Sequence, residues 1–167
     1  DVFLDGGYFL ACLNAKQPPI TDIEIVDSSS KKIIDSFQYP SSNEIPVSGD
    51  IGLYGITIGS ARVSKNYDEK ECLVVSVKFT NNSTEGIAYD VAILDKAFQN
   101  GVQLDMGFVD GSLSGNSLKE IKPGATIELE CVYVLSDSSP VDVEFEELLS
   151  LEDSGTVKKT FELDSMS

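Results

Sequence analysis

A hydrophobic period of two residues runs through Leu73–Ser83, whose sequence is LVVSVKFTNNS. This feature constrains the fold more than any other in the chain. The large apolar side chains stand at alternate positions: Leu73, Val75, Val77 and Phe79. A period of two places side chains on the two faces of a β-strand, whereas a helix needs a period of 3.6. We therefore predict a strand with one face in a core, ended by the turn-forming residues 81–83.

Short alternating runs of the same kind recur along the chain and are separated by clusters of turn residues. The further predicted strands cover Gly52–Lys65, Ile87–Leu94, residues 98–104, Leu118–Ile121, Thr126–Leu135, residues 141–146 and Thr156–Leu163. Seven or eight short strands over about 115 residues are typical of an immunoglobulin-like β-sandwich. The predicted fold class is therefore all-β, with no helical pattern of any length.

Three local signals refine this interpretation. In Gly52–Lys65 the parity of the apolar residues changes at Gly59-Ser60, which predicts a β-bulge. Asn100-Gly101 stands between two short alternating runs, which predicts a hairpin with a type I′ turn whose second arm extends toward residues 106–109. In Ile87–Leu94 the apolar residues alternate, so Tyr89 and Val91 are predicted to share the inner face.

Residues 1–50 are the least regular part of the chain. Ile23-Glu24-Ile25 and residues 33–37 are short enough and close enough to pair as a hairpin. The prolines, serines and glycine of residues 40–49 are typical of a linker. We therefore predict two parts: residues 1–50 as an irregular N-terminal extension or small lobe with a linker, and residues 51–167 as the immunoglobulin-like β-sandwich.

The charge of the chain excludes some partners and favours others. It has 12 basic and 28 acidic residues, for a net charge of −16. Nucleic acid binding is excluded because it depends on lysine and arginine neutralising phosphate, and anionic membrane surfaces are disfavoured for the same reason. Basic partners and divalent cations are favoured. The absence of histidine excludes Ser-His-Asp and Cys-His catalysis and every histidine-ligated zinc site.

The cysteines number three, Cys12, Cys72 and Cys131, and an odd count is not a complete disulfide framework. Cys72 also has the parity opposite to Leu73, so it is not expected to meet Cys131 across a core. We predict three free, mostly buried thiols that pack as small apolar groups. No apolar run approaches the length of about 18 residues that a membrane span requires.

Three segments of the chain resemble a known family: Leu73–Ser83, Lys96–Val102 and Ile121–Pro140. Their strand and turn motifs are similar to those of immunoglobulin-like domains of unknown function in secreted lipoproteins of Gram-positive bacteria. The motifs are LVVSVKFTNNS, DKAFQNGVQL and KEIKPGATIELECVYVLSDSSPVDVEFEE. The resemblance covers about Ile51–Leu163 and supplies no catalytic residues. It implies export to an extracellular or cell-envelope location, with a lipid anchor that belongs to the full-length precursor and is absent from this chain.

Outward-facing carboxylates offer one possible chemistry. They lie on two predicted strands: Glu128, Glu130, Asp142, Glu144 and Glu146. A pair of carboxylates can hydrolyse a glycosidic bond when it flanks a sugar in a cleft, so an enzyme that uses acidic residues is one hypothesis. The alternative is that like charges on an outer face deter edge-to-edge aggregation. The exposed strand positions and the lack of tryptophan favour the second interpretation, and we predict no catalytic residues.

Calcium is a second candidate ligand, because it binds six to eight oxygen atoms from aspartate, asparagine and loop carbonyls. Asp105 and Asp110, with Asn116 in the same region, are the candidate metal ligands, and Asp137 is another. No loop has the EF-hand spacing, and aspartate and asparagine also form ordinary turns. Two hypotheses therefore remain: a calcium-stabilised, adhesion-like domain and a domain that binds no cofactor.

Aromatic residues supply the third candidate, since Tyr39, Tyr54, Tyr67 and Phe98 would give a contact surface if they were exposed. The leading hypothesis is a non-enzymatic binding module with a protein or glycan partner at the cell surface. The alternative is a structural or assembly module that pairs through an edge strand or through residues 1–50. The sequence decides neither the partner nor the oligomeric state.

Overall fold

The computed structural model describes residues 2–4, 8–10, 22–26, 33–38, 41–149 and 154–166. The chain divides into two units, Asp1–Ser41 and Ser42–Ser167. The first unit contains two antiparallel pairs of strands, β1 (Val2–Leu4) with β2 (Tyr8–Leu10) and β3 (Asp22–Val26) with β4 (Ile33–Gln38). The predicted pairing of residues 23–25 with residues 33–37 is therefore confirmed. Cys12 and Tyr39 lie outside the described residues.

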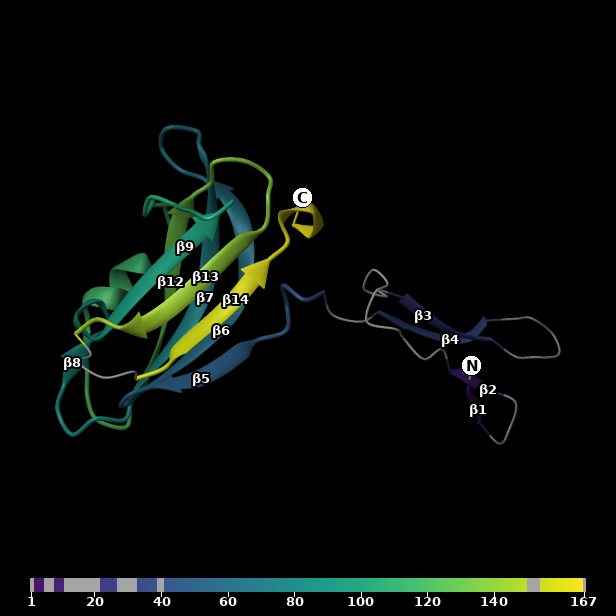
Figure 1. Cartoon of the computed structure of the whole chain (residues 1–167), viewed down its shortest axis with the longest axis horizontal. Helices are drawn as coiled ribbons and strands as arrows, with labels where there is room; N and C mark the ends of the chain where they lie inside the picture. The colour runs from purple at the N-terminus through teal and green to yellow at the C-terminus, as the bar shows by residue number, and fades with distance from the viewer. Residues whose placement is uncertain are drawn as a thin grey trace. The chain divides into compact units, whose positions relative to one another are not determined.

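Two four-stranded antiparallel sheets form the second unit (Figure 1). The first sheet has the order β12-β7-β6-β5, and its strands are β5 (Val47–Ile51), β6 (Tyr54–Lys65), β7 (Glu71–Asn81) and β12 (Thr126–Val134). The second has the order β10-β9-β13-β14, and its strands are β9 (Ile93–Gln99), β10 (Val102–Gln103), β13 (Val141–Glu147) and β14 (Thr156–Phe161). The smaller elements are β8 (Ile87–Ala88) paired with β11 (Glu120–Ile121), the single turn α1 (Tyr89–Ala92), and the 3₁₀ helices η1 (Ser114–Leu118) and η2 (Leu163–Ser165). In the part of the chain that the structure describes, no helix is long and apolar enough to cross a membrane.

The hydrophobic core lies between the two sheets. Figure 1 shows β13 and β14 in front of β7 and β6. The predicted inner face of β7 is fully buried: Leu73, Val75, Val77 and Phe79. Val143, Phe145 and Phe161 of the second sheet belong to the same apolar cluster. The prediction of an all-β sandwich is confirmed, and burial of these apolar side chains is the main stabilising term of such a fold.

The order of the strands differs from that of a constant-type immunoglobulin domain. That domain has strands A, B, E and D in one sheet and C, F and G in the other. The principal strands here, in chain order, are β5, β6, β7, β9, β12, β13 and β14. The third of these, β7, stays beside β6, and the fourth, β9, crosses to the other sheet. The chain thus has a sandwich architecture in which the third and fourth strands have exchanged sheets.

Two of the local predictions are confirmed. The pairing of β6 with β7 shifts register between Ile58 and Ala61, which places the bulge at Gly59-Ser60. Asn100 and Gly101 both have positive φ, 51° and 77°, as the type I′ turn between β9 and β10 requires. The second arm of this hairpin is shorter than predicted, because β10 ends at Gln103 and residues 106–109 follow a different path.

The single strand predicted over Ile87–Leu94 is wrong. One helical turn, α1, interrupts it between β8 and β9. Residues one helical turn apart share a face, so Tyr89 and Ile93 are both buried in the core. Val91 falls on the opposite side and is 58% exposed. The alternating pattern was misleading because Tyr89 and Ile93 satisfy both a period of two and a helical turn.

The segment predicted to be a linker contains a strand. Val47–Ile51 forms β5 and pairs with β6 from Val47 opposite Ile58 to Ile51 opposite Tyr54. The division between the two units falls at residues 41–42, before the predicted boundary at residue 50. The physical reason is that Val47, Gly49 and Ile51 share one parity, and Ile51 is fully buried in the core.

Buried polar side chains fix the loops at the ends of the sandwich. Among the described residues they are Asn43, Asn81, Gln99 and Lys159. The Asn81 amide donates to the carbonyls of Glu85 (2.7 Å) and Ile121 (2.9 Å), and its oxygen accepts from the backbone N–H of Ser83 (2.9 Å). The Lys159 ammonium donates to the carbonyls of three residues of distant segments, Asn43, Ile45 and Gly59. Buried polar groups are tolerated only when they are satisfied in this way.

We predict that Asn81→Ala lowers the free energy of unfolding by about 2–3 kcal/mol, because it removes the partners of the buried Ile121 carbonyl and of the part-buried Ser83 N–H. Urea denaturation followed by circular dichroism measures this loss. The matched control is Asn82→Ala, since the Asn82 side chain is exposed. An equal effect of the two substitutions would contradict the role assigned to Asn81.

Cys72 and Cys131 are both free and buried, as predicted. Cys131 belongs to the core between the sheets, whereas Cys72 packs in a separate apolar cluster. Burial raises the pKa of the Cys72 thiol and raises that of Cys131 further, where the nearby Asp95 carboxylate adds to the effect. A buried thiol with a raised pKa is a poor nucleophile.

We predict that neither cysteine reacts with iodoacetamide at neutral pH in the folded protein and that both react in 6 M guanidinium chloride. Peptide mass spectrometry reads each cysteine separately, so the reactivity of Cys12 does not interfere. Modification of Cys131 at the same rate in both conditions would contradict its place in the core.

Candidate functional site

A second apolar cluster covers part of the outer face of the first sheet. Cys72 and Val74 of β7 point away from the main core, yet both are fully buried. They pack with Val132 of β12 and with Val109, which belongs to the segment between β10 and β11. The outer face of β7 is thus polar only in its second half, from Ser76 onward. The apolar half requires a cover, and residues 104–119 supply it.

The same segment runs along the free edge of β12. The backbone N–H of Val134 donates to the Asp105 carbonyl and the N–H of Gly107 donates to the Val132 carbonyl, both at 2.8 Å. The Asn116 amide donates to the carbonyl of Glu128 at 2.7 Å. These bonds satisfy edge groups that would otherwise be free to pair with another chain. They also fix the position of the side chains at 106 and 108.

Gly107 lies where this segment packs closely on the sheet. A Cβ at position 107 would lie 3.2 Å from side-chain carbons of Val132 and Val134 and 3.3 Å from the Cys72 sulfur. Glycine therefore lets the backbone approach the apolar cluster closely. Met106 and Phe108, on either side of it, are left on the surface with exposed fractions of 71% and 52%.

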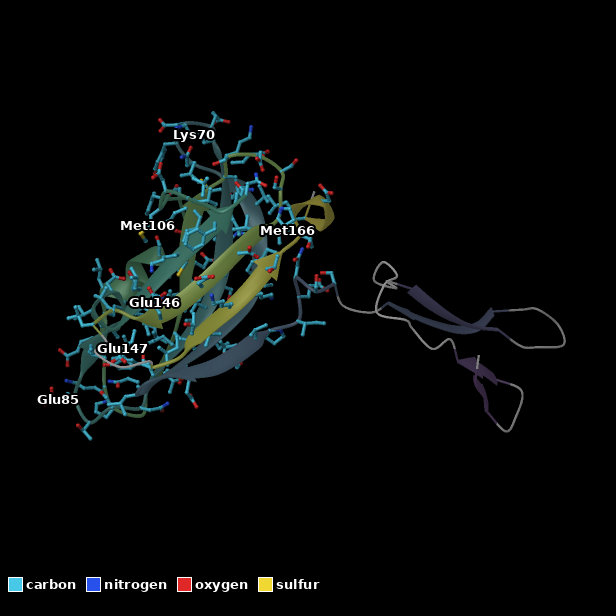
Figure 2. All side chains as sticks on the ribbon, viewed as in Figure 1. Lys70, Glu85, Met106, Glu146, Glu147 and Met166 are labelled. Carbon is cyan, nitrogen blue, oxygen red and sulfur yellow. The ribbon has the colours of Figure 1, made fainter. Side chains whose placement is uncertain are left out.

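The β6–β7 turn forms the other wall of a groove. The nine residues that line this groove, hereafter the Tyr67 groove, are Asn66, Tyr67, Asp68, Lys70, Asp105, Met106, Gly107, Phe108 and Val134. Its volume is about 510 Å³. Figure 2 shows Lys70 and Met106 toward one end of the sandwich and Glu85 at the opposite end. Two loops far apart in sequence thus meet around one hollow.

Two aromatic rings are the main apolar feature of the Tyr67 groove. The rings of Tyr67 and Phe108 are nearly parallel, with an interplanar angle of 9° and centroids 6.2 Å apart. Tyr67 is 77% exposed, although it belongs to a residue type that usually buries its ring. An exposed aromatic pair beside an exposed methionine is unusual on a soluble protein and is typical of a contact surface.

The turn that carries Tyr67 is held by its own hydrogen bonds. The Asn66 side-chain oxygen accepts from the backbone N–H groups of Asp68 (2.9 Å) and Lys70 (3.0 Å). The Asn66 and Lys70 main chains also pair, and Glu69 takes the positive φ of 58° that closes the turn. Tyr67 is therefore presented by a preorganised loop.

Glu130 ties the covering segment to the sheet. Its carboxylate forms an ion pair with Arg62 through both guanidinium nitrogens and accepts a hydrogen bond from the Leu113 N–H at 2.8 Å. The hydrogen bond from Arg62 is the main cause that lowers the pKa of Glu130, with a smaller contribution from Leu113. The same contact raises the pKa of Arg62. One carboxylate thus connects β12, β6 and the loop.

Charge inside the Tyr67 groove is unpaired. Among the described residues, the carboxylates of Asp68 and Asp105 form no hydrogen bond or ion pair, and neither does the Lys70 ammonium. On the sheet faces the arrangement is different, because Glu128 pairs with Lys78 at 2.9 Å and Glu144 pairs with Lys158 at 2.7 Å. The groove therefore presents two carboxylates and one ammonium to solvent.

The structure does not bring the five outward carboxylates together. Glu128 and Glu130 lie on β12 of the first sheet, whereas Asp142, Glu144 and Glu146 lie on β13 of the second. Each has a partner: Lys78, Arg62, Thr160, Lys158 and Lys96, respectively. Glycoside hydrolysis needs two carboxylates that flank a sugar in a cleft, and none of these five residues lines the hollows at Tyr67, at η2 or at Leu53.

The two candidate calcium ligands have different local roles. Asp105 is one of the residues that line the Tyr67 groove, and the Asp110 carboxylate accepts a hydrogen bond from the Gly111 N–H at 3.0 Å. Asn116 is bonded to the backbone of β12, and Asp137 accepts from Ser139 in its own turn. Over residues 41–149 and 154–166, no group of three or more acidic or cysteine side chains could hold a metal ion. Calcium binding through Asp105 and Asp110 stays a prediction.

A polar cluster inside the sandwich surrounds Asp95. The hydroxyls of Tyr133 (2.6 Å) and Tyr89 (3.0 Å) donate to its carboxylate, and Tyr89 also contacts the Cys131 sulfur at 3.5 Å. Burial raises the pKa of both phenols well above the ordinary value. Both hydroxyls are satisfied, so the cluster fixes the packing of β9 against β12.

Two smaller hollows lie elsewhere on the second unit. One, of about 160 Å³, lies beside the C-terminal helix η2 and includes Val63, Leu135 and Met166 in its lining. The other, of about 260 Å³, lies between Leu53 and residues 83–87 at the opposite end. Neither contains an exposed aromatic pair, so the Tyr67 groove is the strongest candidate for a binding site.

The candidate aromatic residues that the structure describes differ in exposure, and their role as a contact surface stays a prediction. Tyr67 is exposed and lies in the groove, but Tyr54 is buried and Phe98 is half-buried. The sequence does not mark Met106 and Phe108 as site residues, because its pattern predicts that residues 106–109 extend the β9–β10 hairpin. A signal was present, since Met106-Gly107-Phe108 places glycine between two large apolar residues directly after the hairpin.

The fold and the groove define an all-β sandwich protein with an exposed aromatic surface at one end. Residues 26–147 match a protein family described as a domain of unknown function (DUF5067). The match covers most of the chain, and the chain belongs to this family. None of the curated proteins matches it.

Two solved structures have a similar fold. One is a putative lipoprotein, ycdA, from Bacillus subtilis, with a TM-score of 0.56 and 11% sequence identity over 72% of this chain. The other is a putative lipoprotein from Staphylococcus aureus, with a TM-score of 0.54 and 11% identity over 73% of this chain. The match spans 40% of the Bacillus chain and 96% of the Staphylococcus chain. At this identity the likeness establishes the fold alone.

We predict that Glu130→Gln lowers the free energy of unfolding by about 1–2 kcal/mol at pH 7, because it replaces a charge-assisted contact to Arg62 with a neutral one. The folded pKa of Glu130 is lowered, so its contribution is fully present above the unfolded pKa of about 4.3 and is lost as pH falls through the folded value. Urea denaturation at a series of pH values should therefore show the two proteins converging in acid. A difference that stays constant with pH would argue against the ion pair.

Proposed function

We propose that this chain is a non-enzymatic binding module of the bacterial cell envelope and that its contact surface is the Tyr67 groove. The observation that carries the proposal is the exposed, parallel pair of Tyr67 and Phe108 beside Met106. Aromatic residues and methionine are enriched at protein interfaces, and tyrosine is prominent among the few residues that dominate binding energy.

The framework of the groove supports this role. Tyr67 stands on a turn with internal hydrogen bonds, and Phe108 stands on a segment bonded along β12 and fixed by Gly107. A site that is already ordered loses little conformational entropy when a partner binds. Recognition by loops at one end of a rigid sandwich is a common use of this architecture.

Location at the envelope is supported by the two structural neighbours, which are both described as putative lipoproteins. The excess of acidic residues disfavours direct adsorption of the chain to an anionic membrane. A lipid anchor in the full-length precursor would instead hold the module at the surface. We take the partner to be a polypeptide, because the apolar part of the groove suits protein side chains.

A non-enzymatic role is supported by the side-chain pairing. The carboxylates of β12 and β13 are engaged in ion pairs or hydrogen bonds on different sheets. The half-buried carboxylate of Asp95 accepts hydrogen bonds from the hydroxyls of two buried tyrosines, Tyr89 and Tyr133. These contacts give the carboxylates of β12 and β13 and of Asp95 structural roles, which do not require catalysis.

We predict that a photoreactive benzophenone amino acid in place of Tyr67 forms a discrete cross-linked product with one protein of the bacterial envelope. The same amino acid in place of Val102, which is 68% exposed on β10 and outside the groove, should form none of that product. Phe108→Ala, combined with the photoreactive residue at 67, should reduce the yield about tenfold or more, since truncation of a central aromatic contact commonly costs that much affinity.

Thermal melting of each variant checks that the fold is intact. Equal cross-linking from positions 67 and 102, or a yield unchanged by Phe108→Ala, would contradict the assignment of the contact surface to the groove.

A further inference from the structure

We propose that the Tyr67 groove selects a cationic side chain, arginine or lysine, from a basic segment of its polypeptide partner. This inference rests on the proposed function and adds the chemistry of the ligand. It follows from the juxtaposition of two exposed aromatic rings with two unpaired carboxylates, Asp68 and Asp105, in one groove.

The aromatic rings provide one half of the recognition. A cation is attracted to the face of a tyrosine or phenylalanine ring within about 6 Å of its centroid. The rings of Tyr67 and Phe108 are nearly parallel, and both are more than half exposed, so ring surface is open to solvent at the groove. Arginine suits such a site especially well because its planar guanidinium stacks on aromatic rings.

The carboxylates provide the other half. Asp68 comes from the β6–β7 turn beside Tyr67, and Asp105 comes from the opposite wall beside Met106. Among the described residues neither carboxylate has a hydrogen-bond or ion-pair partner, whereas Glu128, Glu130, Glu144 and Glu146 on the sheet faces all pair with lysine or arginine. A guanidinium or ammonium group in the groove would give both aspartates the partner that the described residues do not supply.

Lys70 is the opposing charge in the groove. Its ammonium is exposed and has no ion-pair partner among the described residues, so it reduces the attraction for a cation without cancelling that of two carboxylates. Removing this charge should therefore strengthen binding of a cationic ligand and weaken binding of an anionic one. The sign of the Lys70 effect separates the two ligand classes.

The charge of the whole chain acts in the same direction. A net charge of −16 attracts a basic partner at long range and raises its rate of association, an effect that falls with ionic strength. A neutral glycan would gain nothing from this field. The aromatic rings alone would accept a sugar, but the unpaired carboxylates and the net charge favour the basic segment.

Three probes test the proposal on the full chain: a peptide of alternating arginine and glycine, the same peptide with glutamate in place of arginine, and chitohexaose as a neutral glycan. NMR titration follows the ring signals of Tyr67 and Phe108. We expect the arginine peptide to shift both rings, with an affinity that falls about threefold to tenfold in Asp68→Asn combined with Asp105→Asn. Lys70→Gln should raise that affinity, and added salt should lower it.

The matched control is Asp90→Asn, which removes an exposed carboxylate on α1, outside the groove, and should leave the affinity nearly unchanged. The proposal is overturned if the arginine peptide shifts neither ring, if the glutamate peptide or chitohexaose binds more tightly, or if Asp90→Asn weakens binding as much as the groove variants. None of these outcomes affects the cross-linking test from position 67. That test decides the binding-module proposal independently of the charge of the ligand.

Discussion

The burial of β7 on both faces is the constraint on which the rest of the structure depends. Its inner face, from Leu73 to Phe79, packs against the second sheet and forms the core of the sandwich. Its outer face carries Cys72 and Val74, which cannot be left in water without losing the hydrophobic contribution of two more side chains. Residues 104–119 cover them, and that cover is the segment that presents Met106 and Phe108. The candidate site is thus a consequence of how a central strand is shielded.

Buried polar groups perform a complementary task at the ends of the sheets. Asn81 joins its own turn to β11, Gln99 binds both sides of the turn at residues 136–139, and Lys159 joins β14 to the bulge of β6. Each of these side chains bonds to main-chain groups of turns, of a bulge or of a short strand at the end of a sheet. Such bonds contribute modest net stability but specify one loop conformation, because leaving a buried group unpaired is costly.

Charge is distributed in two ways on this acidic protein. On the sheet faces, glutamates stand opposite lysines or arginine on the neighbouring strand, as in Glu128 with Lys78, and such exposed pairs contribute little stability. In the Tyr67 groove, Asp68 and Asp105 form no ion pair within the part of the chain that the structure describes, and the turn that carries Asp68 is held by its own hydrogen bonds. The glutamates of the sheet faces are thus engaged in ion pairs, whereas the groove offers both acidic charge and aromatic surface to a partner.

The sequence by itself determined most of the strands, the sandwich class, the bulge at Gly59-Ser60 and the Asn100-Gly101 turn, because each depends on periodicity or on the φ preference of a few neighbouring residues. It also marked Tyr67 as a candidate contact. Only the tertiary structure decided that β7 and β9 lie in different sheets, that Tyr89 begins a helical turn and that Phe108 faces Tyr67 across a groove. These features depend on contacts between residues far apart in the chain, and a local pattern carries no information about which distant partner a side chain will meet.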